Sequence, residues 1–329
     1  MKPRFSLVIP TIRNLDLFFQ KWRKTIEKYN PEIIIVEDRD KPTIKIPDWV
    51  IEAKVYSRKA IRKDLGKKLS KIIPTQSDGI RSYGFLKATG DIIISLDDDC
   101  YPMNNLHMFH HEVTLEAKYK CSPFYDIFNG EIQPRGYPYN VREEKECVFN
   151  LGLWEGDVDF DAPTELLDLN HFGFNEGVVQ KGLMLPICVM NVAFKRELVP
   201  IYYQLPPGPY QRFHDIWSGF IMKKIIDAID KVMCVGAPYI EHKRKSKTMD
   251  NLVKEAKGIR ANEIMWKIIY NIDIPPRYRT SYNSCYKYMA DTFIALGKEG
   301  VFDEEFSDYL VKCGKSMKLW LQLCKETKY

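Results

Sequence analysis

A run of three isoleucines near the N-terminus constrains the fold more than any other feature of the sequence. The segment from Glu32 to Val36 is rich in isoleucine and lacks alternation, and Asp38 follows closely after it. Such a run is typical of a strand that is buried on both faces, as in a parallel sheet covered by helices. A second apolar run, Phe5 to Ile9, precedes it, and the amphipathic segment Leu15 to Lys28 lies between the two. Strand, helix and strand in this order predict a parallel pair with a right-handed crossover.

The same order recurs before residue 100. Ser77 to Ala88 has a helical pattern, and Thr89 and Gly90 end it. Asp91 to Leu96 then reads as another buried strand, which runs straight into three aspartates, Asp97, Asp98 and Asp99. In parallel sheets of this kind, ligands bind beyond the carboxyl ends of the strands. The acidic residues after these strands therefore mark the expected site.

The second half of the sequence has a different pattern. Between about residues 124 and 191 the chain is rich in Gly, Pro and aromatic residues, which predicts loops and short strands. From residue 251 onward helical periodicity dominates, and six apolar residues form one stripe: Phe306, Leu310, Cys313, Met317, Trp320 and Cys324. We expect an α/β catalytic domain over residues 1–260 and a helical extension over residues 261–329.

Composition excludes several classes of protein. The formal net charge is +5 over 329 residues, with basic and acidic residues interspersed, so no nucleic-acid partner is expected. No segment has the ~18 apolar residues of a transmembrane helix, and the apolar run at the N-terminus breaks at Pro10, unlike a signal peptide. The eight cysteines are scattered without a CxxC pair, which indicates free thiols. These features favour a cytoplasmic protein.

The three adjacent carboxylates repel one another unless a cation or hydrogen-bond donors compensate them. In an extended segment Asp97 and Asp99 point to the same side, where they can bind a hard divalent cation, and Asp98 points the other way. The alternative is a solvated loop or a helix N-terminus, which needs no ion. The buried strand that precedes the triplet favours the metal site.

The segment GDIIISLDDDCYP resembles the DxD region of GT-A glycosyltransferases, and most closely that of the reversibly glycosylated polypeptide family, which includes plant UDP-arabinopyranose mutases. Further stretches match in the family's order: IVEDRDKPTIKIP, RGYPYNVREE, GLWEGDVDFDAPTE, MLPICVMNVAFKREL, RFHDIWSGF and PYIEHKRKS. The resemblance implies a GT-A-like, Rossmann-like α/β fold with a mixed, mainly parallel sheet flanked by helices. It also implies a UDP-sugar substrate and an Mn²⁺ or Mg²⁺ ion between Asp97 or Asp99 and the diphosphate. Such an ion stabilises the charge that develops on departing UDP.

The resemblance also implies a third metal ligand, His242, because a late histidine commonly completes the metal shell in this fold. A neutral imidazole is a competent ligand. The alternative is a surface histidine in a basic loop, since Lys243, Arg244 and Lys245 follow it. Those three cations are also candidates for holding the diphosphate.

Several residues are candidates for binding the nucleotide. Asp38 is expected to accept a hydrogen bond from uracil or ribose, as the resemblance also implies, and Asp40 is a weaker candidate; the alternative for both is a charged turn. Thr11 lies at the same edge of the predicted sheet, and Asp98 is assigned to the nucleotide with it.

Two arginines, Arg58 and Arg81, match arginines of the family. Their planar forks suit a phosphate or an aspartate side chain. Each could instead form a structural ion pair.

The sugar is expected near His214 and Asp215, where the family's members carry two acidic residues and this chain carries His-Asp. Asp215 is the candidate for orienting sugar hydroxyls, and His214 leaves the identity of the sugar open. Trp154, Trp217 and Tyr137 could stack on a sugar ring or simply pack in the core.

Two further arginines, Arg135 and Arg142, flank the sequence GYPYNV, and Arg135 matches the position at which the family carries its reversible sugar. A guanidinium is protonated and has no free lone pair, so attack on a sugar would need a neighbouring carboxylate. The alternative is that both arginines clamp the diphosphate. The resemblance favours Arg135 as the covalent acceptor.

The expected activity is therefore that of a UDP-arabinopyranose mutase, which interconverts pyranose and furanose forms of a UDP-sugar, with reversible self-glycosylation. Two alternatives remain: a metal-dependent transferase that acts on a separate glycan or lipid acceptor, and a non-catalytic UDP-sugar-binding scaffold. Because members of the family assemble as oligomers, a homo-oligomer is a further expectation. The sugar and the metal stay open.

Overall fold

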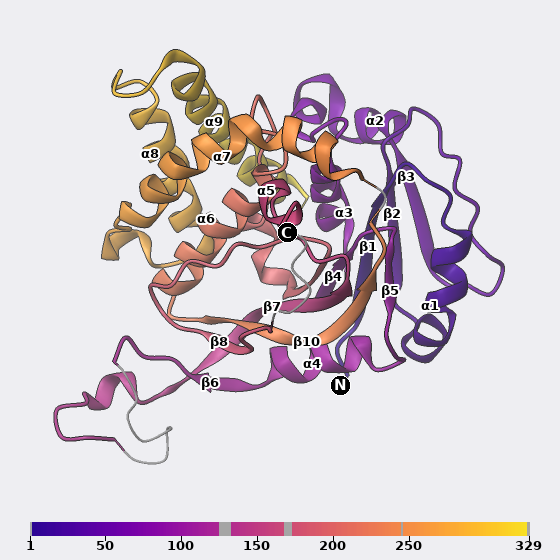
Figure 1. Ribbon diagram of the computed structural model, residues 1–329, viewed down its shortest axis with the longest axis horizontal. Coiled ribbons are helices and arrows are strands. Elements are labelled where there is room, and N and C mark those ends of the chain that lie inside the picture. The colour runs from indigo at the N-terminus through magenta and orange to yellow at the C-terminus, as the bar shows by residue number, and fades with distance from the viewer. Residues whose placement is uncertain (1, 125–132, 168–172, 245, 328–329) are drawn as a thin grey trace.

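The computed structural model describes residues 2–124, 133–167, 173–244 and 246–327. These residues form one mixed sheet with helices on both sides (Figure 1). The order of its main strands is β3-β2-β1-β4-β9-β7-β10-β5. Their bounds are β1 Phe5–Thr11, β2 Glu32–Glu37, β3 Ala53–Ser57, β4 Ile92–Leu96, β5 Cys100–Pro102, β7 Glu144–Gly156, β9 Asn191–Lys195 and β10 Val232–His242. Two short strands, β6 Lys118–Lys120 and β8 Gly177–Val179, pair with β7 and β10.

The first four strands run parallel, as the apolar runs predict. Every residue of β1, β2 and β4 is buried, which explains why their sequences lack alternation. In the register of β1 and β2, Thr11 lies opposite Glu37, so the carboxyl ends of the two strands coincide. The antiparallel β9 then separates this group from the parallel pair β7 and β10. The expected α/β class with a mixed sheet is confirmed.

The helices near the N-terminus follow the predicted pattern with one change. Helix α1 (Asp16–Tyr29) buries Phe18, Phe19 and Trp22 against the body of the protein. The helix expected from Ser77 to Ala88 is divided into the 3-10 turn η2 (Asp78–Ile80) and α3 (Arg81–Lys87). The sequence analysis did not identify β3 or the following helix α2 (Arg58–Leu69).

The prediction of only loops and short strands between residues 124 and 191 is wrong for β7, which has 13 residues. Its eight residues from 147 to 154 are all buried. A strand in the middle of a covered sheet carries no alternation, and the Gly and aromatic residues in it obscured the remaining signal. Shorter elements complete this part of the chain: α4 His107–Glu116, η3 Tyr139–Val141, α5 Ala162–Glu165 and η4 Arg196–Ile201.

The C-terminal part is helical, as predicted. Helix α6 (His214–Ala228) packs against α7 (Thr248–Asn271) and α8 (Tyr282–Leu296), and α8 packs against α9 (Glu304–Glu326). All six residues of the predicted stripe are buried in α9. The boundary expected between residues 260 and 261 falls inside α7, which is one continuous helix. The division into two domains stays a prediction. No helix among the described residues is both long and apolar enough to cross a bilayer.

One segment leaves the body of the protein. The described residues between β6 and β7, 121–124 and 133–143, project outward at the lower left of Figure 1. We call the described residues 118–124 and 133–146 the arm. Its base is the antiparallel pairing of β6 with the first residues of β7.

Candidate metal and nucleotide site

A cavity of about 850 Å³ lies at the carboxyl edge of the sheet. The segments after β1, β2 and β4 line it, together with the end of β10 and the first turn of α6. This is where the strand pattern places the site. Nine of the candidate residues named from the sequence line the cavity: Thr11, Asp38, Asp97, Asp98, Asp99, His214, Asp215, His242 and Arg244.

The three aspartates lie in a turn, since the backbone N–H of Cys100 donates to the carbonyl of Asp97 at 3.2 Å. The extended geometry expected for the triplet is therefore not what the structure has. Asp97 accepts a hydrogen bond from Arg81 at 2.5 Å. Asp98 and Asp99 instead face one guanidinium, that of Arg13, at 2.6 and 3.0 Å. Each carboxylate thus has a cation beside it, as the repulsion argument requires.

Asp99 and His242 form the pair best placed to hold a metal ion. The Nε2 atom of His242 lies 3.7 Å from Oδ1 of Asp99. The Nδ1 atom of His242 lies 2.5 Å from the carbonyl oxygen of Asp157, which only accepts, so Nδ1 carries the proton and the lone pair of Nε2 is free. Because Mg²⁺ binds its ligands at about 2.1 Å, two atoms 3.7 Å apart can share one such ion. The residues therefore fit a divalent cation.

A third possible ligand, the thiol of Cys100, lies within 4.8 Å of the other two. Burial raises the pKa of this thiol well above its usual value, and so does the charge of Asp97. A protonated thiol is a poor ligand for the hard cations Mg²⁺ and Mn²⁺, which prefer oxygen. Asp99 and His242 remain the two protein ligands that the geometry favours.

The sheet itself positions His242. It is the last residue of β10 and pairs with Cys100 of β5, so it lies beside the aspartate triplet rather than in a surface loop. The neighbouring Gly156, at the end of β7, has φ +83, and a Cβ there would lie 2.7 Å from the carbonyl oxygen of His242. A glycine at this position allows the two chains to approach closely. His242 is consequently buried, with 7% of its surface exposed.

Arg58 and Arg81 do not line the cavity, and each holds an aspartate that does. Arg58 pairs with Asp38 through Nε, and its other nitrogens donate to the carbonyls of Ile73 and Pro74. The second carboxylate oxygen of Asp38 accepts the backbone N–H of Gln76 at 2.6 Å. Asp38 is therefore fixed at the cavity wall, and Arg58 acts through it. Asp40 is exposed and pairs with Arg62.

Arg81 is fully buried. It donates to Asp97, to Oγ of Ser95 at 2.6 Å and to the carbonyl of Val189 at 2.8 Å. Burial raises the pKa of Asp97, which the charge of Arg81 opposes. The sequence analysis left open whether Arg58 and Arg81 bind a phosphate or an aspartate. In the structure each of them pairs with an aspartate. Thr11 also holds an aspartate of the site, because its hydroxyl donates to Asp98 at 2.6 Å.

The opposite end of the cavity is built around the first turn of α6. The Nε2 atom of His214 lies 2.9 Å from Oγ of Ser77 and 3.0 Å from Oδ1 of Asp78. Burial alone would lower the pKa of His214, but the charge of Asp78, the hydrogen bond with Asp78 and the charge of Asp215 together raise it above its usual value. His214 thus pairs with Asp78, a carboxylate from a distant part of the chain.

Asp215 has no such partner. Its Oδ1 atom is buried without a hydrogen bond among the described residues. Burial raises the pKa of Asp215 to about 7, and the nearby charges of Asp78 and Asp159 add to this rise. A carboxyl group with this pKa exchanges protons readily at neutral pH.

Several cavity residues were not found from the sequence: Arg13, Asp78, Asp159, Arg212 and Glu255. Arg212 donates to Glu255 at 2.6 Å and so joins the loop before α6 to α7. Asn262 of α7 also lines the cavity, although it lies beyond the predicted domain boundary. Arg13 had a signal in the sequence, because it follows the first predicted strand at the same edge as Asp98, and Asp159 and Arg212 lie in two of the stretches that match the family.

The predicted catalytic arginines lie on the arm and do not line the cavity. Arg135 is exposed, and Arg142 precedes the first residue of β7. The cavity adjoins the other end of that strand, beside His242. Thirteen residues of strand span about 40 Å at ~3.3 Å per residue. The structure therefore does not bring Arg135 or Arg142 to the cavity of its own chain.

The remaining candidates have ordinary structural surroundings. Trp217 is completely buried, and its indole N–H donates to Asn262 at 2.8 Å, so it packs in the core rather than against a sugar. Trp154 is also buried, and Tyr137 lies on the arm. Arg244 lines the cavity and pairs with Glu165, whereas Lys243 is exposed and pairs with Glu241. Lys245 lies outside the described residues.

The fold and the cavity define an α/β protein whose binding site lies at the carboxyl edge of its sheet. The chain belongs to the reversibly glycosylated polypeptide family, whose sequence profile matches residues 2–329. It is 32% identical to probable UDP-arabinopyranose mutase 1 of Zea mays, over 99% of this chain and 92% of that protein. It is 31% identical to UDP-arabinopyranose mutase 1 of Oryza sativa subsp. japonica, with the same coverage.

Solved structures are similar at a lower level. Glucosyl-3-phosphoglycerate synthase from Mycobacterium tuberculosis, in complex with Mn²⁺, UDP-glucose and phosphoglyceric acid, gives a TM-score of 0.45 at 12% identity, with 80% of each chain covered.

Proposed function

We propose that this protein is a UDP-sugar mutase, which interconverts the pyranose and furanose forms of a UDP-pentose such as UDP-arabinose. The observation that carries the proposal is the pair Asp99 and His242 at the wall of a cavity large enough for a nucleotide sugar. The family and the names of its plant relatives support the same activity.

Within this proposal Asp99 and His242 would hold a divalent ion, Mn²⁺ or Mg²⁺, whereas Asp97, which the sequence analysis expected as a ligand, lies outside this group and pairs with Arg81. The ion stabilises the negative charge on UDP when the bond to the anomeric carbon breaks. Asp38, fixed by Arg58, receives a uracil or ribose donor on the β2 side of the cavity. Thr11, at the end of β1, lies between Asp38 after β2 and the triplet after β4, and its hydroxyl donates to Asp98.

Asp215 acts on the sugar at the α6 side of the cavity. When a pyranose becomes a furanose, the bond from C1 to the ring oxygen breaks and a bond from C1 to the 4-hydroxyl oxygen forms. The 4-hydroxyl loses a proton, and the former ring oxygen gains one. A carboxyl group with a pKa of about 7 and a free oxygen can accept the first proton and donate the second.

Self-glycosylation at Arg135 takes a specific form in this proposal. Because the arm does not reach the cavity of its own chain, a sugar on Arg135 comes from the cavity of a second copy in a homo-oligomer. The acidic cavity of that copy would also supply the carboxylate that a guanidinium nucleophile needs. Arg142 then supports the arm, since its guanidinium lies 3.8 Å from the ring centroid of Tyr139.

The test is incubation of the purified protein with UDP-arabinopyranose and Mn²⁺, followed by separation of the two ring forms. We expect UDP-arabinofuranose to appear, and its formation to stop when a chelator removes the metal. Recovery of only the starting material would refute the mutase activity. Sugar transferred to a separate glycan or lipid would instead establish a transferase. The eight free thiols support the proposal that the protein acts in the cytoplasm.

A further inference from the structure

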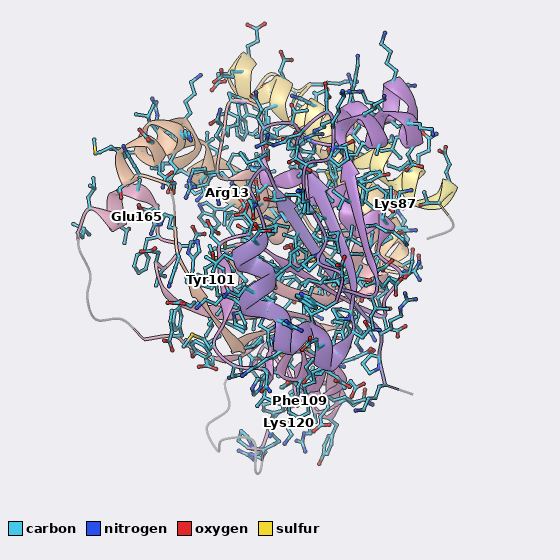
Figure 2. All side chains as sticks on the ribbon, turned by 90° about the vertical axis from the view of Figure 1, so that its right-hand side faces the viewer. Arg13, Lys87, Tyr101, Phe109, Lys120 and Glu165 are labelled. Atoms are coloured by element: carbon cyan, nitrogen blue, oxygen red, sulfur yellow. The ribbon has the colours of Figure 1, made fainter. Side chains whose placement is uncertain are left out.

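Arg13 occupies the position where a cation is needed by two of the three aspartates. Its Nη1 atom lies 2.6 Å from Oδ1 of Asp98 and 3.0 Å from Oδ2 of Asp99 (Figure 2 labels Arg13). The other oxygen of Asp99, Oδ1, is the one near His242. Arg13 and a metal ion at the Asp99–His242 pair would therefore lie on the same carboxylate.

Arg13 differs from the neighbouring Arg81 in its freedom to move. Arg81 is fully buried and has hydrogen bonds to four different residues, so it cannot leave Asp97 without opening the core. The side chain of Arg13 is 40% exposed, and within the described part of the chain its guanidinium donates only to Asp98 and Asp99. Its backbone is held separately, because its N–H donates to Oγ1 of Thr11 at 2.9 Å. The guanidinium can turn while the loop stays in place.

The binding of a metal ion changes the electrostatic surroundings of the Arg13 guanidinium. A divalent ion at Asp99 places positive charge beside the guanidinium and removes its negative partner. A diphosphate that binds the same ion brings new negative charge into the cavity. The planar fork of an arginine suits phosphate oxygens at least as well as carboxylates.

We propose that Arg13 is a counter-ion of Asp98 and Asp99 in the empty cavity and a ligand of the diphosphate in the loaded one. The proposal rests on the UDP-sugar site described above and assigns a diphosphate-binding residue to it. In the empty protein Arg13 prevents repulsion within the triplet and competes with free metal. In the complex it holds the nucleotide.

This exchange couples the two ligands. Metal alone must bind Asp99 against the positive charge of Arg13 on the other oxygen of that carboxylate, whereas metal that arrives with UDP gives Arg13 a new partner. Each ligand therefore raises the affinity for the other, and the coupling is reciprocal. The protein binds the nucleotide and the metal together in preference to either alone.

The test is titration of the full chain with Mn²⁺ in the absence and presence of saturating UDP, by calorimetry and by electron paramagnetic resonance of free Mn²⁺. For Arg13→Gln we expect Mn²⁺ alone to bind about 5- to 20-fold more tightly, and UDP with Mn²⁺ to bind roughly 10-fold more weakly, within the usual range of coupling between sites. Arg13→Lys keeps the charge without the planar fork, so its affinities for Mn²⁺ and for UDP with Mn²⁺ should lie between those of the wild type and those of Arg13→Gln. Arg62→Gln is the matched control, since it removes one positive charge from an exposed pair with Asp40.

The proposal predicts opposite changes in Arg13→Gln, namely tighter binding of Mn²⁺ alone and weaker binding of UDP with Mn²⁺. These opposite changes distinguish the proposed role of Arg13 from a purely structural one. A variant that merely distorts the loop would weaken Mn²⁺ and UDP together, and that result would overturn the proposal. Unchanged Mn²⁺ affinity in Arg13→Gln would also overturn it, because no competition would then exist. If the wild-type protein bound neither Mn²⁺ nor UDP, the UDP-sugar site itself would fail, which is a distinguishable outcome. A thermal melt of each variant shows that it is folded.

Discussion

The cavity and the arm use arginine in opposite ways. At the cavity Arg13, Arg58 and Arg81 are each tied to an aspartate of the site. On the arm, among the described residues, no carboxylate pairs with Arg135 or Arg142, and the second of these lies on an aromatic ring. A paired arginine orders acidic groups for a cation, whereas an exposed one is free to meet another molecule. The difference suggests that the cavity performs the chemistry and that the arm presents a residue to it.

Replacing a metal ligand should have the largest effect, because it removes function from both regions. We expect Asp99→Asn to lower ring interconversion roughly 100- to 1,000-fold, as the loss of a transition-state charge stabiliser does. Labelling of the arm by a radiolabelled UDP-sugar should stop as well. The fold should be intact, and the thermal melt without metal unchanged or slightly raised, since one repelling charge is gone. Asp291→Asn, at an exposed pair on α8, is the control. Full turnover by Asp99→Asn at ordinary Mn²⁺ concentration would contradict the assignment.

Replacing Arg135 should affect the arm alone. Arg135→Lys and Arg135→Ala should both lose the sugar label, because a lysine keeps the charge but not the guanidinium nitrogen. Mixing Arg135→Ala, which has an intact cavity, with Asp99→Asn, which has an intact arm, should restore the label on the Asp99→Asn chain.

One result of the mixing experiment would contradict the proposed separation between the arm and the cavity. Label that appears in the wild type and never in the mixture would mean that each arm folds back to its own cavity. Partial activity in Arg135→Lys, with less in Arg135→Ala, would mean that Arg135 only stabilises the diphosphate. Peptide mapping that finds the label on Arg142 or Tyr137 would refute Arg135 as the acceptor.

Removal of the imidazole should have a smaller effect than removal of the carboxylate. His242→Ala should weaken Mn²⁺ binding by roughly 10- to 100-fold, by analogy with the loss of groups that support metal ligands. Calorimetry measures the affinity directly, and labelling of the arm should recover at high Mn²⁺. An affinity equal to that of the wild type would show that His242 is not a ligand.

The smallest effect concerns α4, the helix that leads into the arm. Burial lowers the pKa of His107 to about 4, and its Nε2 atom lies 2.9 Å from Oδ1 of Asn191. Since the unfolded chain has a histidine pKa near 6.5, it binds more protons than the folded chain between these values. The contribution of His107 to stability should therefore be constant above about pH 6.5 and fall as the pH drops towards 4, by roughly 1 to 3 kcal/mol.

Denaturant unfolding at several pH values measures this slope. His107→Asn should reduce it. An equal slope in the wild type and in His107→Asn from pH 6.5 to 4.5 would show that His107 is not held neutral by the fold.

The sequence was informative where local pattern decides structure. Unbroken apolar runs predicted β1, β2 and β4, and the acidic residues after them predicted Asp38 and the triplet at one edge of the sheet. His242 required the family resemblance, because its own surroundings read as a basic loop.

The partner of each carboxylate could not be predicted. The contact of Arg13 with Asp99 spans 86 positions, and that of His214 with Asp78 spans 136. Such contacts depend on how the sheet and helices assemble, which local periodicity does not report. The separation between the arm and the cavity has the same origin, since only the length and direction of β7 reveal it.

The central claim is that Asp99 and His242 bind a divalent metal ion at the edge of the sheet and that this ion binds the diphosphate of a UDP-sugar. Electron spin echo spectroscopy of the protein with Mn²⁺ and UDP tests it directly, because it detects nitrogen and phosphorus nuclei that lie beside the ion. We predict ¹⁴N modulation from one imidazole and ³¹P coupling from the diphosphate in the wild type, with loss of the ¹⁴N signal in His242→Ala. Bound Mn²⁺ with ³¹P coupling but no ¹⁴N signal in the wild type would contradict the account.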